Sequence, residues 1–248
     1  MRELCHMLEF EDFVYLDVQK TGSTFARIFL REFAATREIA GKKHRPVEQR
    51  IDGKLYIISC RNPLQQYRSL YTFGCLGKGK MRTRSESESI LQLYDGSVAG
   101  FSAWLELILT PSTSRNHLSS FDNHPILDIV GMQTLRFLRL ALPSFRGPLR
   151  KLKNRDDVLT AFRRDGLCDV LLKTESLSND LGNLVTGQYA GLFKNTTAAV
   201  ASLADRPKKN SSTERFEIDL TALSPEMLLL VQQREWFFFE ALGYPPLV

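Results

Sequence analysis

Residues 19–24 combine residue types that suit a phosphate-binding turn. The segment reads Gln-Lys-Thr-Gly-Ser-Thr and stands between an apolar, β-rich run and a segment with helical spacing. A turn from a buried strand into a helix exposes backbone N–H groups at the positive end of the helix dipole, where anions bind. Gly22 lets the backbone approach the anion, and Lys20 adds a positive charge. Hydroxyl donors come from Thr21, Ser23 and Thr24.

Two alternatives stand beside this interpretation of the turn. In the Walker A pattern the lysine follows the glycines and precedes a serine or threonine. Here Lys20 precedes Gly22, so an ordinary P-loop NTPase is disfavoured. The other alternative is a Ser/Thr-capped turn with a solvated lysine, which binds nothing.

Arg61 and Ser69 form a second candidate site. Arg61 follows an apolar run at 54–60, and Ser69 lies eight residues later, about two helical turns on, near the side of the helix where Arg61 stands. A guanidinium donates two parallel hydrogen bonds to a phosphate, so the pair could hold a second phosphate group. A strand-end arginine paired with a carboxylate, beside a surface serine, would explain the same residues without a ligand.

At these two sites the chain resembles the sulfotransferases that use 3′-phosphoadenosine 5′-phosphosulfate (PAPS). QKTGST is similar to their PKTGGT or PKTASTS loop, and CRNPLQQYRSLY is similar to their RxPxxRxxSxY motif. The likeness is to the bacterial and Golgi-type carbohydrate enzymes. Weaker similarities follow in family order at 131–133, 172–177 and 209–211.

The resemblance implies a role for each of these segments. Lys20 would neutralise the leaving phosphate, and residues 21–24 would hold the 5′-phosphate. Arg61 and Ser69 would hold the 3′-phosphate, and a loop would close over the nucleotide with Lys209, Asn210 and Ser211. The implied reaction moves the sulfuryl group of PAPS to a hydroxyl of a carbohydrate or small molecule and releases adenosine 3′,5′-bisphosphate. It requires no metal.

The chain also departs from the family pattern. Gln19 replaces the usual proline, and Ser23 the usual glycine or alanine. Gln66 and Tyr67 displace the expected internal arginine, for which Arg68 is the available substitute. These changes also fit a member that binds the nucleotide without catalysing transfer.

The reaction needs a base to accept the proton of the acceptor hydroxyl. In the resembling carbohydrate enzymes a histidine between the first helix and the second strand often has this role, which assigns it to His44. Basic neighbours close in space would lower the pKa of His44 and favour its neutral form. A solvated basic loop is the alternative. Glu48 is the reserve base, whereas His6, His117 and His124 are expected at a terminus or in surface loops.

The elements that must position these residues suggest an α/β fold. We predict strands at 13–18, 54–60 and 169–173, the runs with strand-like composition. Helices are predicted from 25 to 33 and from 63 to about 75, around 101–109 and 132–142, and from 225 to 242. Residues 77–89 are expected to form a mobile loop, and residues 143–156 a basic, exposed connection. The prediction is a single domain over 1–248, a small central parallel sheet flanked by helices, as in the P-loop-like sulfotransferase fold that the resemblance implies.

Composition limits the class of protein. Of the 248 residues 43% are hydrophobic, enough for a buried core, and the net charge of +5 is too small to indicate nucleic acid as the partner. The four cysteines lack metal-binding or disulfide spacing. With no signal-peptide pattern and no long apolar run, we expect a cytoplasmic, bacterial protein without a membrane span.

Two other functions remain open on the sequence alone. A phosphotransferase using ATP and magnesium would need the Walker A lysine and a second acidic motif, which are missing. A non-catalytic, basic module for polyanions would bind with an affinity that falls steeply with salt and does not depend on Lys20 or Ser69. The acceptor pocket of a sulfotransferase is expected from the loops at 77–89 and 109–125, whose sequence does not identify the acceptor.

Overall fold

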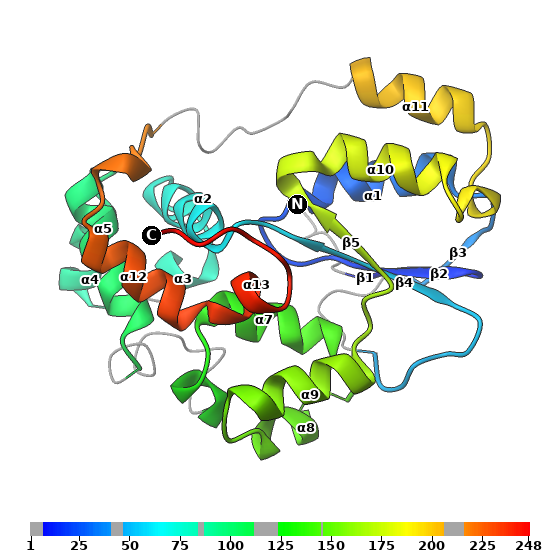
Figure 1. The fold of residues 1–248 in the computed structure, drawn as a ribbon. Helices are drawn as coiled ribbons and strands as arrows, with labels where there is room; N and C mark the ends of the chain where they lie inside the picture. Colours follow the sequence, from blue (N-terminus) through cyan, green and yellow to red (C-terminus); the bar gives the residue numbers. More distant parts are fainter. Residues whose placement is uncertain (1–6, 41–46, 84–86, 112–123, 145, 206–215) are drawn as a thin grey trace. The chain divides into compact units, whose positions relative to one another are not determined.

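The fold contains one mixed five-stranded sheet. The computed structural model describes residues 7–40, 47–83, 87–111, 124–144, 146–205 and 216–248. The sheet order is β3-β1-β2-β4-β5 (Figure 1). The strands are β1 (Met7–Phe10), β2 (Phe13–Leu16), β3 (Glu38–Ala40), β4 (Leu55–Cys60) and β5 (Val170–Lys173).

The three predicted strands are confirmed, and they are parallel to one another. β2 pairs with β4 from Phe13 opposite Leu55, and β4 pairs with β5 from Ile57 opposite Val170. The prediction of a purely parallel sheet is wrong, however, because β1 and β3 extend it on the β2 side as antiparallel strands. The result is an α/β fold with parallel pairs in a mixed sheet.

The chain forms two compact units that are interleaved in sequence. The first, unit 1, comprises residues 1–61, 136–148 and 160–209, and the second, unit 2, the remainder. The single domain expected over 1–248 stays a prediction.

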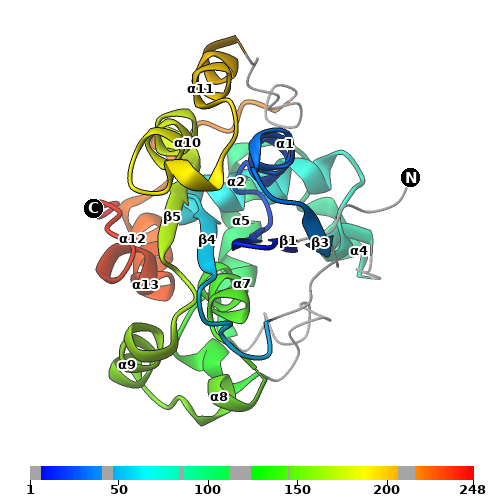
Figure 2. The same cartoon turned by 90° about the vertical axis from the view of Figure 1, so that its right-hand side faces the viewer.

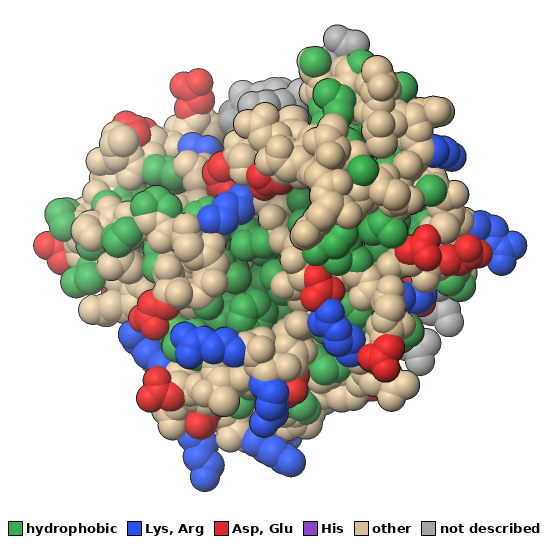
Figure 3. Space-filling model, turned by 45° about the vertical axis from the view of Figure 1, so that its right-hand side comes forward, with side chains coloured by type: hydrophobic (Ala, Val, Ile, Leu, Met, Phe, Trp, Pro, Cys, Tyr) green, Lys and Arg blue, Asp and Glu red, His purple; other side chains and the backbone are tan. Residues whose placement is uncertain are grey.

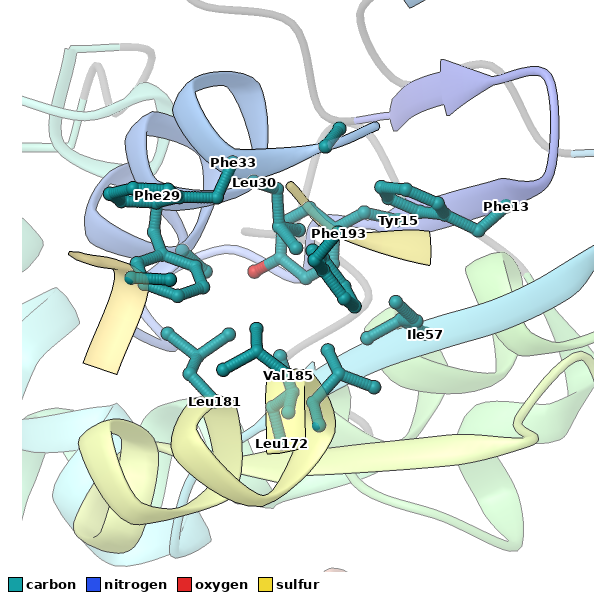
Figure 4. Packing of buried hydrophobic residues seen from close by; sticks show 14 of the residues in the cluster. Phe13, Tyr15, Phe29, Leu30, Phe33, Ile57, Leu172, Leu181, Val185 and Phe193 are labelled. Atoms are coloured by element: carbon teal, nitrogen blue, oxygen red, sulfur yellow. The ribbon is translucent and has the colours of Figure 1, made fainter. Parts of the chain in front are cut away.

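The core of unit 1 lies between the sheet and three helices. α1 (Ser23–Phe33), α10 (Leu177–Thr186) and α11 (Thr196–Asp205) lie on one side of the sheet (Figures 1 and 2). Aromatic and aliphatic side chains from both layers meet there, as Figure 4 shows for Phe13, Tyr15, Phe29, Ile57 and Leu181. The alternate strand residues Val14, Leu16, Tyr56 and Ile58 are buried as well, so both faces of the parallel strands are covered.

The helix α1 begins and ends close to its predicted bounds. Of the apolar residues whose helical spacing predicted it, Phe29 and Phe33 are buried and Phe25 packs against the core. Ile28 is the exception, since it is 54% exposed, whereas Ala26 and Leu30 are fully buried. The buried face therefore follows residues 26, 29, 30 and 33 and overlaps the predicted one.

Unit 2 contains a second core made by helices. α2 (Pro63–Cys75) begins at its predicted cap, where the Asn62 side chain accepts hydrogen bonds from the N–H groups of Leu64 and Gln65. α5 (Val98–Leu109) and α12 (Pro225–Arg234) pack with it around Tyr67, Trp104 and Val231.

Several segments differ from their predicted structure. Residues 77–89, expected to be a loop, contain α3 (Lys80–Thr83) and the start of α4 (Glu88–Gln92). The connection expected at 143–156 contains α8 (Arg146–Lys151) and the start of α9 (Arg155–Asp165). The last helix divides at Glu235 into α12 and α13 (Trp236–Glu240). The described residues also form α7 (Met132–Ala141) and the short 3-10 helices η1 (Pro125–Asp128), η2 (Thr174–Ser176), η3 (Ala190–Leu192) and η4 (Leu220–Ala222).

Candidate anion-binding site

The carboxyl ends of the three parallel strands meet at one edge of unit 1. The turn of residues 19–22 follows β2, Arg61 follows β4, and Thr174 follows β5. The Thr174 hydroxyl donates to the carbonyl of Cys60 at 2.9 Å, which joins the ends of β4 and β5. Ligands of open α/β sheets bind outside this edge, so the fold presents the predicted turn and Arg61 where a ligand is expected.

Lys20 has an unusual backbone conformation at this edge. Its φ of 68° lies in the left-handed region, which residues other than glycine rarely adopt. The side chain is half-buried, and burial together with the nearby positive charge of Arg61 lowers the pKa of Lys20 to about 8. Both causes disfavour the cation, and a bound anion would offset both.

Gly22 precedes α1 and directs the beginning of this helix toward the carboxyl ends of the strands. Its φ of 71° is left-handed, and it is the N-cap residue of α1. A Cβ at this position would lie 2.8 Å from the Leu177 side chain, so only glycine lets the β5–α10 connection approach the turn. The N–H of Phe25 bonds to the Gly22 carbonyl at 3.0 Å. Since glycine has no side chain with which to cap the helix, the N–H groups of Ser23 and Thr24 receive no side-chain cap and suit water or an anionic ligand.

The Thr21 hydroxyl faces inward and not toward a ligand. Thr21 is fully buried, and its Oγ1 donates to the Val18 carbonyl at 2.6 Å. Its single hydrogen is therefore used, so the Ser59 hydroxyl must donate in the 2.6 Å contact with Thr21 Oγ1. The Tyr15 hydroxyl in turn donates to Ser59 at 2.9 Å. Of the three hydroxyls expected to serve a ligand, Thr21 instead fixes the turn, while Ser23 is half-buried and Thr24 exposed.

Replacing Thr21 by valine is expected to destabilise the fold by about 1–3 kcal/mol, because the Val18 carbonyl and the Ser59 hydroxyl would lose a buried partner. Equilibrium unfolding in urea measures the change. The control Thr24→Val, at the exposed position of the same turn, should stay within about 0.5 kcal/mol of wild type. Equal losses in the two variants would show that the buried hydroxyl chain does not stabilise the turn.

The sequence analysis did not predict an ion pair that links β2 to α1 beside the turn. Asp17, directly after β2, and Arg27 on α1 are both almost fully buried, with Arg27 Nη1 3.5 Å from Asp17 Oδ2. The pair links the strand to the helix on either side of the turn. An aspartate after a strand and an arginine ten residues later give no distinctive sequence signal.

The second predicted site divides between the two units. Arg61 is half-buried at the end of β4 in unit 1, whereas Ser69 is buried on α2 in unit 2. Their joint contact with one phosphate therefore stays a prediction. Arg68, the expected substitute arginine, donates to Gln65 Oε1 at 2.6 Å and to the carbonyl of Ile218 at 3.5 Å. Its guanidinium is thus bonded within unit 2.

Several predicted residues lie outside the described part of the chain. His44, the proposed base, is one of them, and so are Lys209, Asn210, Ser211 and the histidines 6 and 117. His124 is described: its Nδ1 accepts a hydrogen bond from the N–H of Ile126 at the start of η1. Burial, followed by the charge of Arg150, lowers the pKa of His124. The reserve base Glu48 is exposed, and its carboxylate accepts a hydrogen bond from Ser144 at 3.2 Å.

A cavity of about 480 Å³ lies at the opposite edge of the sheet. Its lining includes Asp12, Lys54 and Asp169, which come just before or at the beginning of β2, β4 and β5. Its two cations are already paired with carboxylates, since Lys54 bonds to Glu9 at 2.6 Å and Arg50 to Asp169 at 2.5 Å. These pairs make the cavity less suited to an anion than the Lys20 turn.

Comparison with protein-family models, curated proteins and solved structures gives no match for this chain. Within the described ranges no group of three or more His, Cys, Asp and Glu could hold a metal ion. In the same ranges no helix has the length and hydropathy to cross a bilayer.

Proposed function

We propose that the chain is a sulfotransferase that uses PAPS and acts on a hydroxyl of a carbohydrate or small molecule. The observation that carries the proposal is Lys20, a half-buried lysine in a left-handed conformation, next to Arg61 at the carboxyl ends of parallel strands. Residues with a strained backbone cluster at functional sites, and two neighbouring positive charges favour the binding of an anion. The fold would then be the P-loop-like sulfotransferase fold.

In the proposed reaction the acceptor hydroxyl attacks the sulfur of PAPS in line. The bond from sulfur to the bridging phosphate oxygen breaks, adenosine 3′,5′-bisphosphate leaves, and the hydroxyl proton passes to a base, for which His44 stays the proposed residue. The protein supplies orientation and charge stabilisation. Lys20 would neutralise the bridging oxygen as the bond breaks. The backbone N–H groups of residues 21–24 would hold the 5′-phosphate, and Arg61 the 3′-phosphate.

The alternative of a polyanion-binding module has less support. On the face drawn in Figure 3, Lys and Arg side chains stand singly or in small groups among Asp and Glu. A surface that binds polyanions usually presents basic side chains clustered on one face.

Thermal unfolding with added nucleotide tests the proposal. Adenosine 3′,5′-bisphosphate at about a hundred times its dissociation constant should stabilise the protein by about 2.7 kcal/mol. For a chain of this length that is a rise in Tm of about 5–11 °C. Neither 5′-AMP nor ATP with magnesium should match it, and Arg61→Ala should lose it. A shift with ATP and magnesium alone would favour a phosphotransferase. No shift with any nucleotide would contradict the proposal.

The affinity for adenosine 3′,5′-bisphosphate should fall above pH 8. The pKa of Lys20 in the free protein is about 8, so the cation is lost as the pH rises through this value. The ligand's phosphates, whose second pKa is about 6, are almost fully ionised over this range, and a bound anion raises the pKa of the amine again. Binding is then coupled to proton uptake, and Kd should rise about tenfold from pH 7 to pH 9.

Calorimetry in buffers of different ionisation enthalpy measures both the Kd and the proton uptake. The control is Lys20→Arg, whose guanidinium stays charged over this range, so its Kd should be constant between pH 7 and 9. A wild-type Kd that is equally constant would mean that Lys20 does not face the bound anion.

A further inference from the structure

A chain of three hydroxyls in unit 1 runs from two neighbouring strands to the turn that contains Lys20. The Tyr15 hydroxyl on β2 donates to Ser59 on β4 at 2.9 Å, and Ser59 donates to Thr21 at 2.6 Å. Thr21 in turn donates to the carbonyl of Val18 at 2.6 Å. All three hydroxyl residues are fully buried. Because each hydroxyl has a single hydrogen, every bond has a fixed direction, and the chain ends at the Val18 carbonyl.

The last bond of this chain encloses Lys20. It joins residues 18 and 21, so the two residues between them, Gln19 and Lys20, form the tip of a closed turn. There Lys20 has its φ of 68°, which is unfavourable for a residue with a Cβ and persists only where the surroundings hold it. Without a bond across the turn, we expect the backbone of Lys20 to relax and its side chain to leave its half-buried place near Arg61.

The first two hydroxyls of the chain are held firmly. Tyr15 belongs to the core of unit 1, and burial, followed by the negative charge of Asp17, raises the pKa of its phenol well above the ordinary value. The phenol therefore stays a donor over the pH range in which the Lys20 amine titrates. Ser59 is fixed by the pairing of β4 with β5, where it lies opposite Leu172. Since bonds in such a chain polarise one another, loss of one donor weakens the bonds that follow it.

We propose that Tyr15 and Ser59 are positioning residues, which hold the Lys20 side chain near Arg61 by fixing the turn through the Thr21 hydroxyl. Neither residue touches a ligand in this proposal, because both are fully buried. Their effect passes through Thr21 and reaches Lys20 along the backbone. The placement of Lys20 is a property of the ligand-free protein, and only its use for a bound anion rests on the proposed function.

The test measures the pKa of the Lys20 amine in the ligand-free full chain, by NMR of lysine labelled with ¹³C at Cε. Lys20→Arg identifies the signal. In the wild type the pKa should be about 8. Ser59→Ala and Tyr15→Phe should each raise it by about one unit toward the ordinary value of 10.5, as the amine gains water and moves away from Arg61. Thr21→Ser keeps the last hydroxyl of the chain, so its pKa should stay at about 8.

Tyr56→Phe is the matched control in the same unit. Tyr56 is a fully buried tyrosine near the other end of β4, and its hydroxyl accepts a hydrogen bond from the N–H of Ile51 at 3.0 Å. This variant should lose stability without a change in the pKa of Lys20. An unchanged pKa in Ser59→Ala or in Tyr15→Phe would overturn the inference, as would an equal rise in Tyr56→Phe or a wild-type pKa at the ordinary value.

The proposed function fails by a different measurement. If calorimetry detects no binding of adenosine 3′,5′-bisphosphate to the wild-type chain, that function is contradicted, whereas the pKa comparison in the ligand-free protein still decides whether Tyr15 and Ser59 position Lys20.

Discussion

Replacing Lys20 by alanine is expected to lower the rate of sulfuryl transfer by about 10²–10³-fold, as when one donor that stabilises transition-state charge is removed. Lys20 stands at the end of β2 beside Arg61, where the leaving phosphate of PAPS is proposed to gain its negative charge. Steady-state rates with PAPS and a panel of hydroxyl acceptors measure the effect. The exposed Lys194 provides the control, and Lys194→Ala should keep the wild-type rate.

Because the backbone of Lys20 is left-handed, two substitutions can separate the effect of losing its charge from the effect on stability. Lys20→Gly and Lys20→Ala both remove the amine, so both should be equally inactive. Glycine adopts a φ of 68° without the Cβ clash, so the glycine variant should be more stable than the alanine variant by about 1 kcal/mol. Full activity in either variant would contradict the proposed role of Lys20.

Replacing Gly131 by alanine is expected to destabilise the protein by about 3 kcal/mol, from overpacking and the loss of buried hydrogen bonds. The added Cβ would lie 2.2 Å from Glu235 Oε1 and 2.5 Å from its Cδ. A carboxylate usually moves aside easily, but this one is fully buried and is held by Tyr67, Gln133 and Thr134. Differential scanning calorimetry should show a fall in Tm of about 6–12 °C.

Gly147 gives a matched control for this substitution. It is exposed in α8, and a Cβ at this position meets nothing within 4 Å. Gly147→Ala should leave the protein as stable as wild type or stabilise it by about 0.5–1 kcal/mol, since alanine favours the helix. A Gly131→Ala protein as stable as Gly147→Ala would show that Glu235 can leave its place at little cost.

Local signals in the sequence predicted the parallel strands and the helices that follow them. The strand runs at 13–18, 54–60 and 169–173 are apolar and β-rich, and Asn62-Pro63 is a helix start that depends only on adjacent residues. β1 and β3 were missed because they are defined by pairing: Met7–Phe10 lies between β2 and Glu38–Ala40 and hydrogen-bonds to both. Such pairing has little signature in composition.

The candidate site was predictable in its residue types but not in the direction of its side chains. The turn and Arg61 lie at the expected edge of the sheet. The inward direction of Thr21 is linked to a hydroxyl chain with Ser59 and Tyr15. Ser59 is 38 positions from Thr21 and 44 positions from Tyr15 in the sequence. Glu235 gave one weak signal, a carboxylate directly before the apolar run 236–239. Its partners are more than 100 positions away, which no local pattern reveals.

The interleaving of the two units has a consequence for synthesis on the ribosome. Unit 1 needs residues up to 209, so neither unit can complete its core as an amino-terminal domain would. β4 ends at Cys60, but its parallel neighbour β5 begins at Val170. Translation proceeds at about 5–20 residues per second, so one edge of β4 stays unpaired for roughly 5–20 s before β5 is synthesised. An unpaired edge is a template for association with other chains, so we expect this edge of β4 to be open to such association until translation reaches β5.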